Sequence, residues 1–322
     1  MFSKFRELGL VFFIVVISII VQIRNPAFLT MNNLGNLFTN AAILGILSVG
    51  MMMVLLTGGI DLSIASVIAF SGMLTAMTVQ AYPGVPVIIL VLESIAIGAV
   101  MGLVTGFLIA RFSMLPIIAT LGMMNIVRGL TYVISRGAWV SAYQMPDSFK
   151  NIATNRFLGI NNLVVIAVAV FVVFYFFLNH TRTGRRIYAV GSNREAADII
   201  GLPAKRIITL VYTLMGSLAG LCGVLWVSRF ASAQGDTALG YEMNVIASCV
   251  LGGVAVYGGR GNVLGLLLGV VLFGILANAL PLVHISPFWQ QAIQGLVILT
   301  AIIVNVMIKR NNDLINLRQR AI

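Results

Sequence analysis

The sequence predicts an all-α, polytopic membrane protein with about ten transmembrane helices and both termini in the cytoplasm. Three observations predict it. Of the 322 residues, 60% are hydrophobic and only 9% are charged, and the mean hydropathy is +1.04, whereas a soluble domain carries about 25% charged residues. Apolar runs of about 20 residues, enough to cross a bilayer core of about 30 Å, recur along the chain. Basic residues gather in a few loops and in the C-terminal tail.

Ten apolar runs define the predicted spans. They cover residues 8–24, 41–57, 63–80, 87–110, 116–135, 161–179, 207–228, 243–257, 262–283 and 287–308. Backbone polar groups in lipid must bond within their own segment, so runs of this length form helices. The strands of a membrane barrel, about ten residues of alternating polarity, do not occur. Residues 1–322 are expected to form a single transmembrane domain with a cytoplasmic loop at 180–206.

The distribution of basic residues sets the predicted topology. With the N-terminus inside, fourteen Lys and Arg residues fall in inside segments and five in outside loops. Cytoplasmic loops are the ones enriched in Lys and Arg, so an even number of spans with both ends inside is favoured. The same bias explains the net charge of +11 without a nucleic-acid partner.

Metal and cofactor sites are not indicated by the sequence. His180 and His284 lie far apart at the ends of spans, and Cys222 and Cys249 lie within apolar spans as small core residues. The run from Leu8 to Ile20 has no small-residue cleavage pattern after it, so it is expected to be an uncleaved first span.

Two outside loops are long enough to dock a partner. The first, 136–160, includes Trp139, Tyr143, Asp147 and Lys150, and the second, 229–242, includes Asp236 and Glu242. Segment 31–40 places apolar residues at helical spacing among asparagines, which predicts a short helix at the outer surface.

The cytoplasmic loop 180–206 carries six basic residues and a short predicted helix. Ser192 to Glu195 fits a capping box, with the serine as cap, and two turns with an apolar face follow. Gly201 and Pro203 then end the helix. An apolar helix displayed on a loop needs a partner, either a protein groove or anionic lipid headgroups. Small alanines favour the protein groove, but lipid remains an alternative.

The loop resembles a known family. Glu195-Ala196-Ala197-x-x-x-Gly201 is similar to the cytoplasmic coupling loop of ATP-binding-cassette import permeases. Other stretches are similar to the ribose/xylose/galactose branch of that family, and the resemblance covers about residues 25–305: Thr57 to Ser63, Ile118 to Gly122 with Arg128-Gly129, Thr183 to Arg185, Tyr188 to Gly191, Gly240 to Glu242, Val250 to Gly253, Gly258 to Gly261, and Ser286 to Trp289. Thr105, Met243 and Ser248 depart from the family pattern at packing positions.

The resemblance implies a non-catalytic permease subunit of a sugar importer in the bacterial inner membrane. Its implied partners are a cytoplasmic ATPase, a periplasmic sugar-binding protein and a second permease subunit, identical or not. ATP would be bound by the ATPase partner, since this chain has no phosphate-binding loop of the G-x-x-x-x-G-K-[ST] type. The residues implied in ATPase coupling are Glu195, Ala196, Ala197 and Gly201.

Polar residues inside spans are candidates for the transport path, because such groups are costly in lipid. Arg128 and Asn125 share one helix face and, with Asn278, are candidates to line the path; backbone carbonyls are an alternative partner for Arg128. Asp61 and Glu93 are candidates for a gate or for a structural role, the former as a helix cap.

An ion-coupled secondary transporter is the alternative function. It would use broken helices near mid-membrane, and the glycine-rich break at 58–61 together with Glu93 and Arg128 supports it. The sequence does not identify the transported sugar.

Overall fold

The computed structural model describes residues 2–286 and isolated positions between 289 and 303. Within this part of the chain, eight helices are long and apolar enough to cross a membrane. They are α1 (Phe2–Arg24), α2 (Met31–Leu56), α3 (Ile64–Ala81), α4 (Val87–Phe112), α5 (Pro116–Ser135), α7 (Asn162–His180), α10 (Ala204–Phe230) and α12 (Val263–Leu282).

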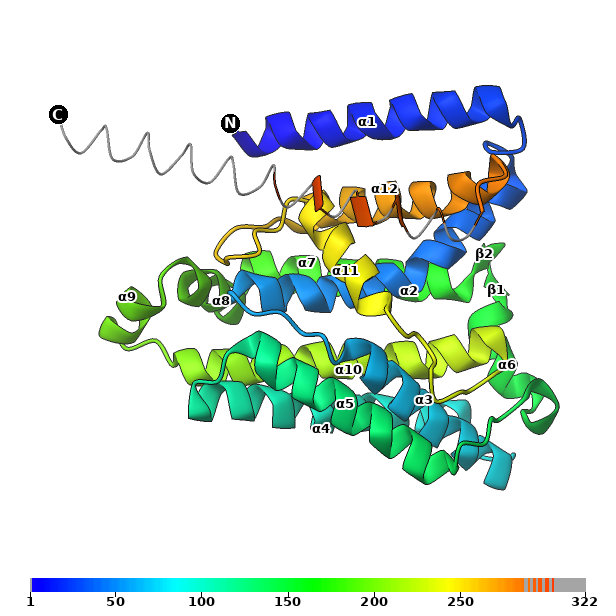
Figure 1. Ribbon diagram of the computed structural model, residues 1–322, viewed down its shortest axis with the longest axis horizontal. Coiled ribbons are helices and arrows are strands. Elements are labelled where there is room, and N and C mark those ends of the chain that lie inside the picture. The colour runs from blue at the N-terminus through cyan, green and yellow to red at the C-terminus, as the bar shows by residue number, and fades with distance from the viewer. Residues whose placement is uncertain are drawn as a thin grey trace.

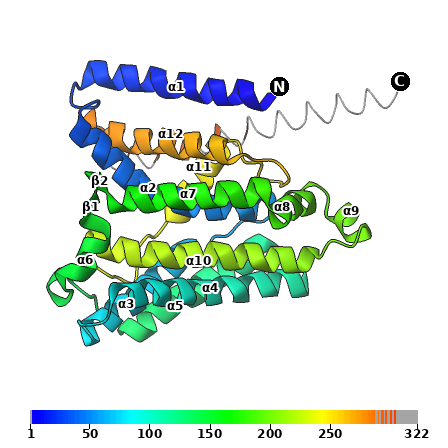
Figure 2. The same cartoon turned by 180° about the vertical axis from the view of Figure 1, so that it is seen from behind.

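Shorter elements cluster at the two ends of this bundle. The N-terminus, α8 (Arg182–Ser192) and α9 (Arg194–Ile199) lie at one end. The opposite end carries η1 (Ala142–Gln144), α6 (Asp147–Thr154) and the two-residue antiparallel strands β1 (Arg156–Phe157) and β2 (Ile160–Asn161) (Figures 1 and 2). The end with α8 and α9 is called the cytoplasmic end and the other the outer end. The N-terminus and loop 180–206 therefore share one end, as the charge pattern predicts.

Two predicted elements differ in extent from the structure. Segment 31–40 is no separate surface helix. It is the first part of α2, whose 26 residues extend about 39 Å. The Thr30 hydroxyl caps α2 by accepting a hydrogen bond from the Asn33 N–H at 3.4 Å. Leu37 is already buried at 2% exposure, whereas Phe38 is 45% exposed, so only part of the apolar face of this segment packs inward.

The predicted span 243–257 is wrong. Its residues form α11 (Tyr241–Leu251), which has 11 residues and is about 16 Å long, too short to cross a bilayer. The helix ends at Gly252, and Gly253 follows with φ +78°, a backbone conformation that glycine adopts freely. The chain then turns through residues 252–262 into α12. The predicted last span, 287–308, lies outside the fully described residues.

The helix α2 forms the centre of the core. Its apolar window is 89% buried, and it contacts α7, α10, α11 and α12. Residues Leu44 to Leu56 present buried side chains all round the helix, which is typical of a helix enclosed by others. Cys222 and Cys249 are free and fully buried in this core.

Two helices begin inside the bundle instead of at its ends. Residues 57–63 leave the cytoplasmic end of α2 without helical structure and run back to the start of α3. Residues 231–240 leave the outer end of α10 in the same way and reach the start of α11 (Figure 1). We call residues 57–63 and 231–240 the two discontinuous segments. Non-helical backbone at membrane depth is tolerated only where protein groups or water satisfy it, so the partners of these segments matter.

Candidate functional site

The cytoplasmic loop folds into α8 and α9, separated by Asn193. The Asn193 side chain accepts a hydrogen bond from the Ala196 N–H at 2.9 Å and so caps α9. The predicted cap, Ser192, is instead the last residue of α8. The capping assignment was therefore off by one residue, because α8 extends further than the sequence pattern suggested.

The helix α9 displays most of its surface to solvent. Of its residues only Ala197 is buried, at 2% exposure. Ile199, the last residue of α9, is 85% exposed, and Ile200, which follows the helix, is 72% exposed. Glu195 and Ala196 are also exposed. An exposed pair of isoleucines on a short helix is an unpartnered apolar surface, because nothing in the described part of the chain covers it.

Gly201 ends this helix as the sequence predicts. Its φ is +75°, a conformation that costs an L-residue about 1–2 kcal/mol. The Gly201 N–H donates to the Asp198 carbonyl at 3.1 Å and the Leu202 N–H donates to the Ala197 carbonyl at 2.9 Å. A Cβ added at Gly201 would meet nothing within 4 Å, so glycine here serves the turn and leaves room for a partner.

The helix α8 connects α9 to the membrane-embedded core through four glycines, which we call the glycine junction (Gly58, Gly191, Gly258 and Gly259). A Cβ at Gly191 would collide with the Leu56 carbonyl oxygen at the end of α2. The Gly259 N–H donates to that same carbonyl at 2.9 Å. Three stretches far apart in the sequence therefore meet backbone to backbone.

The Tyr188 side chain reinforces the junction. Its hydroxyl donates to the Gly261 carbonyl at 3.1 Å, and burial raises the pKa of this phenol above its ordinary value. The hydroxyl therefore stays a hydrogen-bond donor throughout the physiological pH range. Any displacement of α8 acts on the end of α2 and on the 252–262 turn together.

One helix, α5, supports both discontinuous segments. The Thr120 hydroxyl donates to the Ile60 carbonyl at 3.4 Å, in segment 57–63. Two turns further along, Arg128 Nη1 donates to the carbonyls of Gly235 and Thr237 at 2.7 and 2.9 Å, in segment 231–240. Arg128 thus bonds backbone carbonyls, the alternative that the sequence left open.

The second discontinuous segment is partly packed into the protein, while Asp236, Leu239 and Gly240 remain exposed. Ala233, Thr237 and Ala238 are buried, and Val140 and Ala233 form a β-bridge to the 136–160 region. Glu242 is 8% exposed, and its Oε2 has no hydrogen-bond partner among the described residues. Arg128 lies within electrostatic range of Glu242, which reduces the cost of placing that carboxylate here.

The predicted path residues do not come together. Asn125 is exposed, and its amide donates to the Leu121 carbonyl of its own helix at 2.9 Å, so it does not share a site with Arg128. Asn278 on α12 pairs with Asn33 on α2 through two hydrogen bonds of 2.9 and 3.1 Å. Arg128 turns toward segment 231–240, so the two side chains have separate hydrogen-bond partners.

Asp61 and Glu93 both make structural contacts. Asp61 is 2% exposed, and its Oδ1 accepts hydrogen bonds from the N–H and hydroxyl of Ser63 at 2.9 and 2.6 Å, at the start of α3. Glu93 Oε1 accepts a hydrogen bond of 2.7 Å from the Thr78 hydroxyl, which joins α3 to α4.

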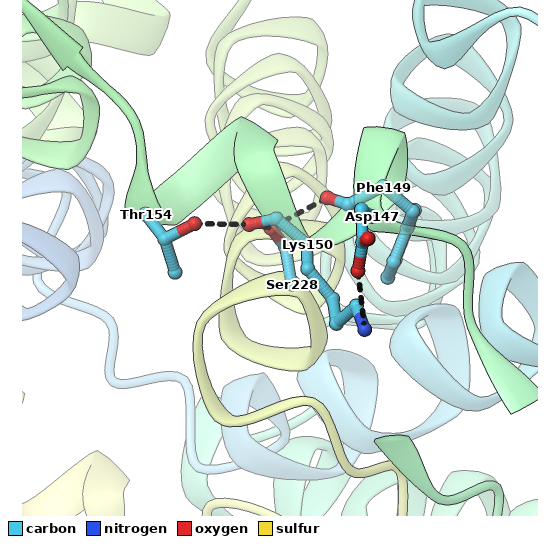
Figure 3. Close-up of polar contacts among 5 residues, drawn as sticks. All are labelled: Asp147, Phe149, Lys150, Thr154 and Ser228. Atoms are coloured by element: carbon cyan, nitrogen blue, oxygen red, sulfur yellow. Dashed lines mark hydrogen bonds and ion pairs between the residues drawn. The ribbon is translucent and has the colours of Figure 1, made fainter. Parts of the chain in front are cut away.

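At the outer end, α6 is fastened to α10 by a buried hydroxyl (Figure 3). Ser228 Oγ donates to the Phe149 carbonyl at 2.8 Å and accepts from the Ala153 N–H at 3.0 Å. Asp147 and Lys150 form an ion pair of 2.7 Å on the exposed side of α6. Lys150 holds the pKa of the Asp147 carboxyl below its usual value. Trp139 and Tyr143, 62% and 87% exposed, lie in the segment just before this helix.

These features define a class of protein: a multi-pass membrane protein with interrupted helices at its centre and a capped helix projecting at one end. Comparison with known proteins specifies the family. The family described as "Branched-chain amino acid transport system / permease component" matches residues 33–302, and the chain belongs to it. No solved structure matches the chain.

Individual relatives cover nearly the whole chain. The ribose import permease protein of Escherichia coli strain K12 is 38% identical over 296 residues, 91% of each chain. That of Bacillus subtilis strain 168 is 39% identical over 300 residues, 93% of this chain and 92% of the relative. The L-arabinose ABC transporter permease protein of Azospirillum brasilense is 36% identical over 295 residues, 92% and 86%.

The chain is therefore a membrane-spanning permease subunit of an ATP-binding-cassette importer, a translocation component without catalytic activity of its own. A permease of this kind works with an ATPase and a substrate-binding protein. The prediction of an importer permease is confirmed, and the secondary transporter is set aside.

Proposed function

We propose that the chain forms the path for a monosaccharide through the bacterial inner membrane. The three relatives named above are 36–39% identical to the chain, and a further ribose permease is 34% identical. The names of all four contain ribose or arabinose. The family description instead names branched-chain amino acids. Near-complete coverage of the sugar permeases supports a sugar of similar size as the substrate.

The observation that carries the mechanism is the placement of α9. It is capped by Asn193, stopped by Gly201, and exposes Ile199 and Ile200 away from the membrane-embedded bundle. We assign Glu195, Ala196, Ala197 and Gly201 to ATPase docking, with Ala197 holding α9 to the bundle. The exposed isoleucines supply apolar surface for a protein groove.

The glycine junction provides the route by which docking acts on the path. A displacement of α9 moves α8, whose Gly191 touches the end of α2 and the 252–262 turn. These elements continue into the discontinuous segment 57–63 and back into α11. Closely packed backbones transmit small shifts because they are not freely deformable. The two discontinuous segments are therefore the parts of the path that we expect to move.

A second permease subunit and an outer binding protein complete the proposed complex. The exposed side of α5 carries Gly122, Asn125 and Gly129, and a Cβ at either glycine would meet nothing within 4 Å. A second subunit packed along this side would leave the Asn125 amide available to a passing solute. The exposed Trp139 and Tyr143 suit docking of the periplasmic binding protein, since aromatic residues are enriched at interfaces.

Site-directed crosslinking tests the docking role. Both native cysteines are fully buried, so a cysteine introduced as Ile199→Cys is the preferred target of a maleimide crosslinker added from the cytoplasmic side. Capture of the ATPase from Ile199→Cys and no capture from Leu158→Cys, on the exposed turn at the outer end, is the expected result. Capture from the outer position, or none from Ile199→Cys despite efficient labelling, contradicts the assignment.

A further inference from the structure

A small cavity with both polar and apolar lining residues lies between α2, α11 and α12, separate from α5 and from the glycine junction. Its volume is about 170 Å³, which is about six times the volume of a water molecule in the liquid. Drug-sized pockets are several times larger. Its polar lining consists of three asparagines and one tyrosine, and we call it the asparagine cavity: Asn40, Tyr241, Asn244 and Asn278.

Two of the asparagines are held in fixed orientations. Arg229 donates from Nη1 to the Thr39 carbonyl at 2.9 Å and from Nη2 to the Asn40 amide oxygen. Because a guanidinium only donates, Asn40 turns its oxygen toward Arg229, which leaves its NH₂ group and one oxygen lone pair free. Asn278 is fixed by its paired hydrogen bonds to Asn33, which leave one lone pair and one N–H unused.

The remaining two polar groups are unsatisfied. Among the described residues, neither the Asn244 amide nor the Tyr241 hydroxyl has a hydrogen-bond partner. Moving an amide or a hydroxyl into an apolar environment without a hydrogen bond costs about 2–7 kcal/mol, so both groups favour a polar molecule beside them. The cavity reaches the surface at the exposed Asn40 and is large enough to admit water or a small polar ligand.

The composition of the lining selects the chemistry of that ligand. The four polar groups offer both donors and acceptors and carry no charge. Arg229, which borders this site through Asn40, is already bonded to Thr39 and Asn40. An amino-acid zwitterion would need both an acid and a base, and a phosphate would need free cations. Hydroxyl groups, each a donor and an acceptor, match the lining directly.

We propose that the asparagine cavity binds one small polyhydroxylated molecule, a monosaccharide, during transport. The assignment rests on the proposed function in one respect, that the transported solute is a sugar. Tyr241 supplies an aromatic wall, and its ring meets Trp226 edge-on at a centroid distance of 5.1 Å. Asn40 and Asn278 are held in place before binding, and Asn244 and Tyr241 gain partners when the ligand enters.

The contact between Tyr241 and Trp226 provides a direct readout. The chain has three tryptophans, so the double variant Trp139→Phe, Trp289→Phe leaves Trp226 as the sole reporter. The full-length double variant in lipid nanodiscs is titrated with ribose, arabinose and leucine. A saturable change in Trp226 fluorescence with a pentose, and none with leucine, is the expected result. No response to either pentose overturns the proposal.

Variants of the lining locate the site. In the Trp226-only background, Asn244→Leu is expected to weaken the pentose response about tenfold, the fold-change for the loss of one or two hydrogen bonds. Ala277→Phe, which fills the cavity without removing an amide, is expected to abolish the response. Thr39→Val removes a hydroxyl one position from Asn40, on a side chain bonded to its own helix, and is the matched control with an unchanged response.

Uptake by the whole importer separates failure of the site from failure of the proposed function. Sugar uptake with a Trp226 response that both lining variants leave unchanged overturns the cavity and keeps the sugar assignment. Leucine uptake without sugar uptake overturns the sugar assignment and the cavity with it. Size-exclusion profiles that match the parent confirm that each variant is folded. If Asn244→Leu does not fold, Ala277→Phe still tests the cavity.

Discussion

At the scale of single residues, the polar side chains inside this bundle mostly bond backbone carbonyls. Arg128 reaches two carbonyls of segment 231–240, and Thr120 reaches one in segment 57–63. The Ser94 hydroxyl donates to the Gly220 carbonyl across the α4–α10 contact at 2.6 Å. Such carbonyls lack water to bond in a membrane, so each of these side chains satisfies a group that would otherwise be costly.

Arg128 can be tested by removing its donors. Arg128→Leu leaves the Gly235 and Thr237 carbonyls without these bonds, and the loss of two charge-assisted hydrogen bonds is worth about 3 kcal/mol or more. We expect faster hydrogen exchange over residues 231–240 and loss of transport, with Arg128→Lys intermediate because it keeps the charge and donors. Exchange and uptake equal to the parent in Arg128→Leu would show that the segment is held by other contacts.

Gly191 is the residue where a methyl group should interrupt coupling. Gly191→Ala places a Cβ against the Leu56 carbonyl, and overpacking of this kind costs about 1–3 kcal/mol. We expect normal membrane insertion and ATPase activity, with substrate uptake reduced about tenfold. Gly35→Ala, at a position where a Cβ meets nothing within 4 Å, is the control. Parent-like uptake in Gly191→Ala would exclude the glycine junction as the route of coupling.

At the scale of elements, the pairing of α4 with α10 depends on facing glycines. A Cβ at Gly98 would collide with the Gly216 carbonyl, and a Cβ at Gly220 would collide with the Ser94 carbonyl. Small residues at four-residue spacing let membrane helices approach closely, and the repeat of glycines at 98, 102 and 106 in the sequence predicts this packing. The close approach also brings the Ser94 hydroxyl within reach of α10.

A pair of alanine substitutions tests this packing. Gly98→Ala forces α4 and α10 apart and is expected to lower stability by about 1–3 kcal/mol. Gly129→Ala lies on the exposed side of α5 with no neighbour within 4 Å, and removing glycine from a helix is worth about 0.5–1 kcal/mol in the opposite direction. Thermal unfolding of both variants in the same detergent gives the comparison. Equal midpoints would show that the α4–α10 contact is loose.

At the scale of the whole molecule, the two ends of the bundle carry different surfaces. The cytoplasmic end displays α9 with its exposed isoleucines, and the outer end displays α6 with the exposed aromatic residues before it (Figures 1 and 2). The interrupted helices lie between them. An energy-supplying subunit at one end and a delivering protein at the other fit this division, with the glycine junction joining the cytoplasmic surface to the interrupted helices.

At the scale of the whole molecule, the testable prediction concerns the energy source of solute uptake. Solute uptake is expected to stop when cells are depleted of ATP and the membrane potential is maintained. The reason is that ATP hydrolysis by a partner ATPase drives transport. Collapse of the potential at normal ATP is expected to leave uptake largely unchanged. Uptake that survives ATP depletion and stops with the potential would instead identify ion coupling through the interrupted helices.

The sequence by itself determined the membrane class, most of the spans, the placement of the N-terminus and loop 180–206 at one end of the bundle, and the short helix before Gly201. These follow from local signals: hydropathy over about 20 residues, loop charge, and capping residues next to one another in the chain. The family relationship also rested on short motifs, and three of them, around Gly58, Gly191 and Gly258, meet in the glycine junction.

Only the tertiary structure decided which polar groups share a site. Asn125 and Arg128 lie three residues apart yet have separate partners, while Asn40, Asn244 and Asn278 line one cavity from three helices. The hydropathy pattern also joined α11 and the turn after it into one predicted span, because an apolar segment has the same hydropathy whether it is helical or folded back. A hydrogen bond between distant segments leaves no periodic trace in the sequence, because its geometry is fixed by how helices pack against each other.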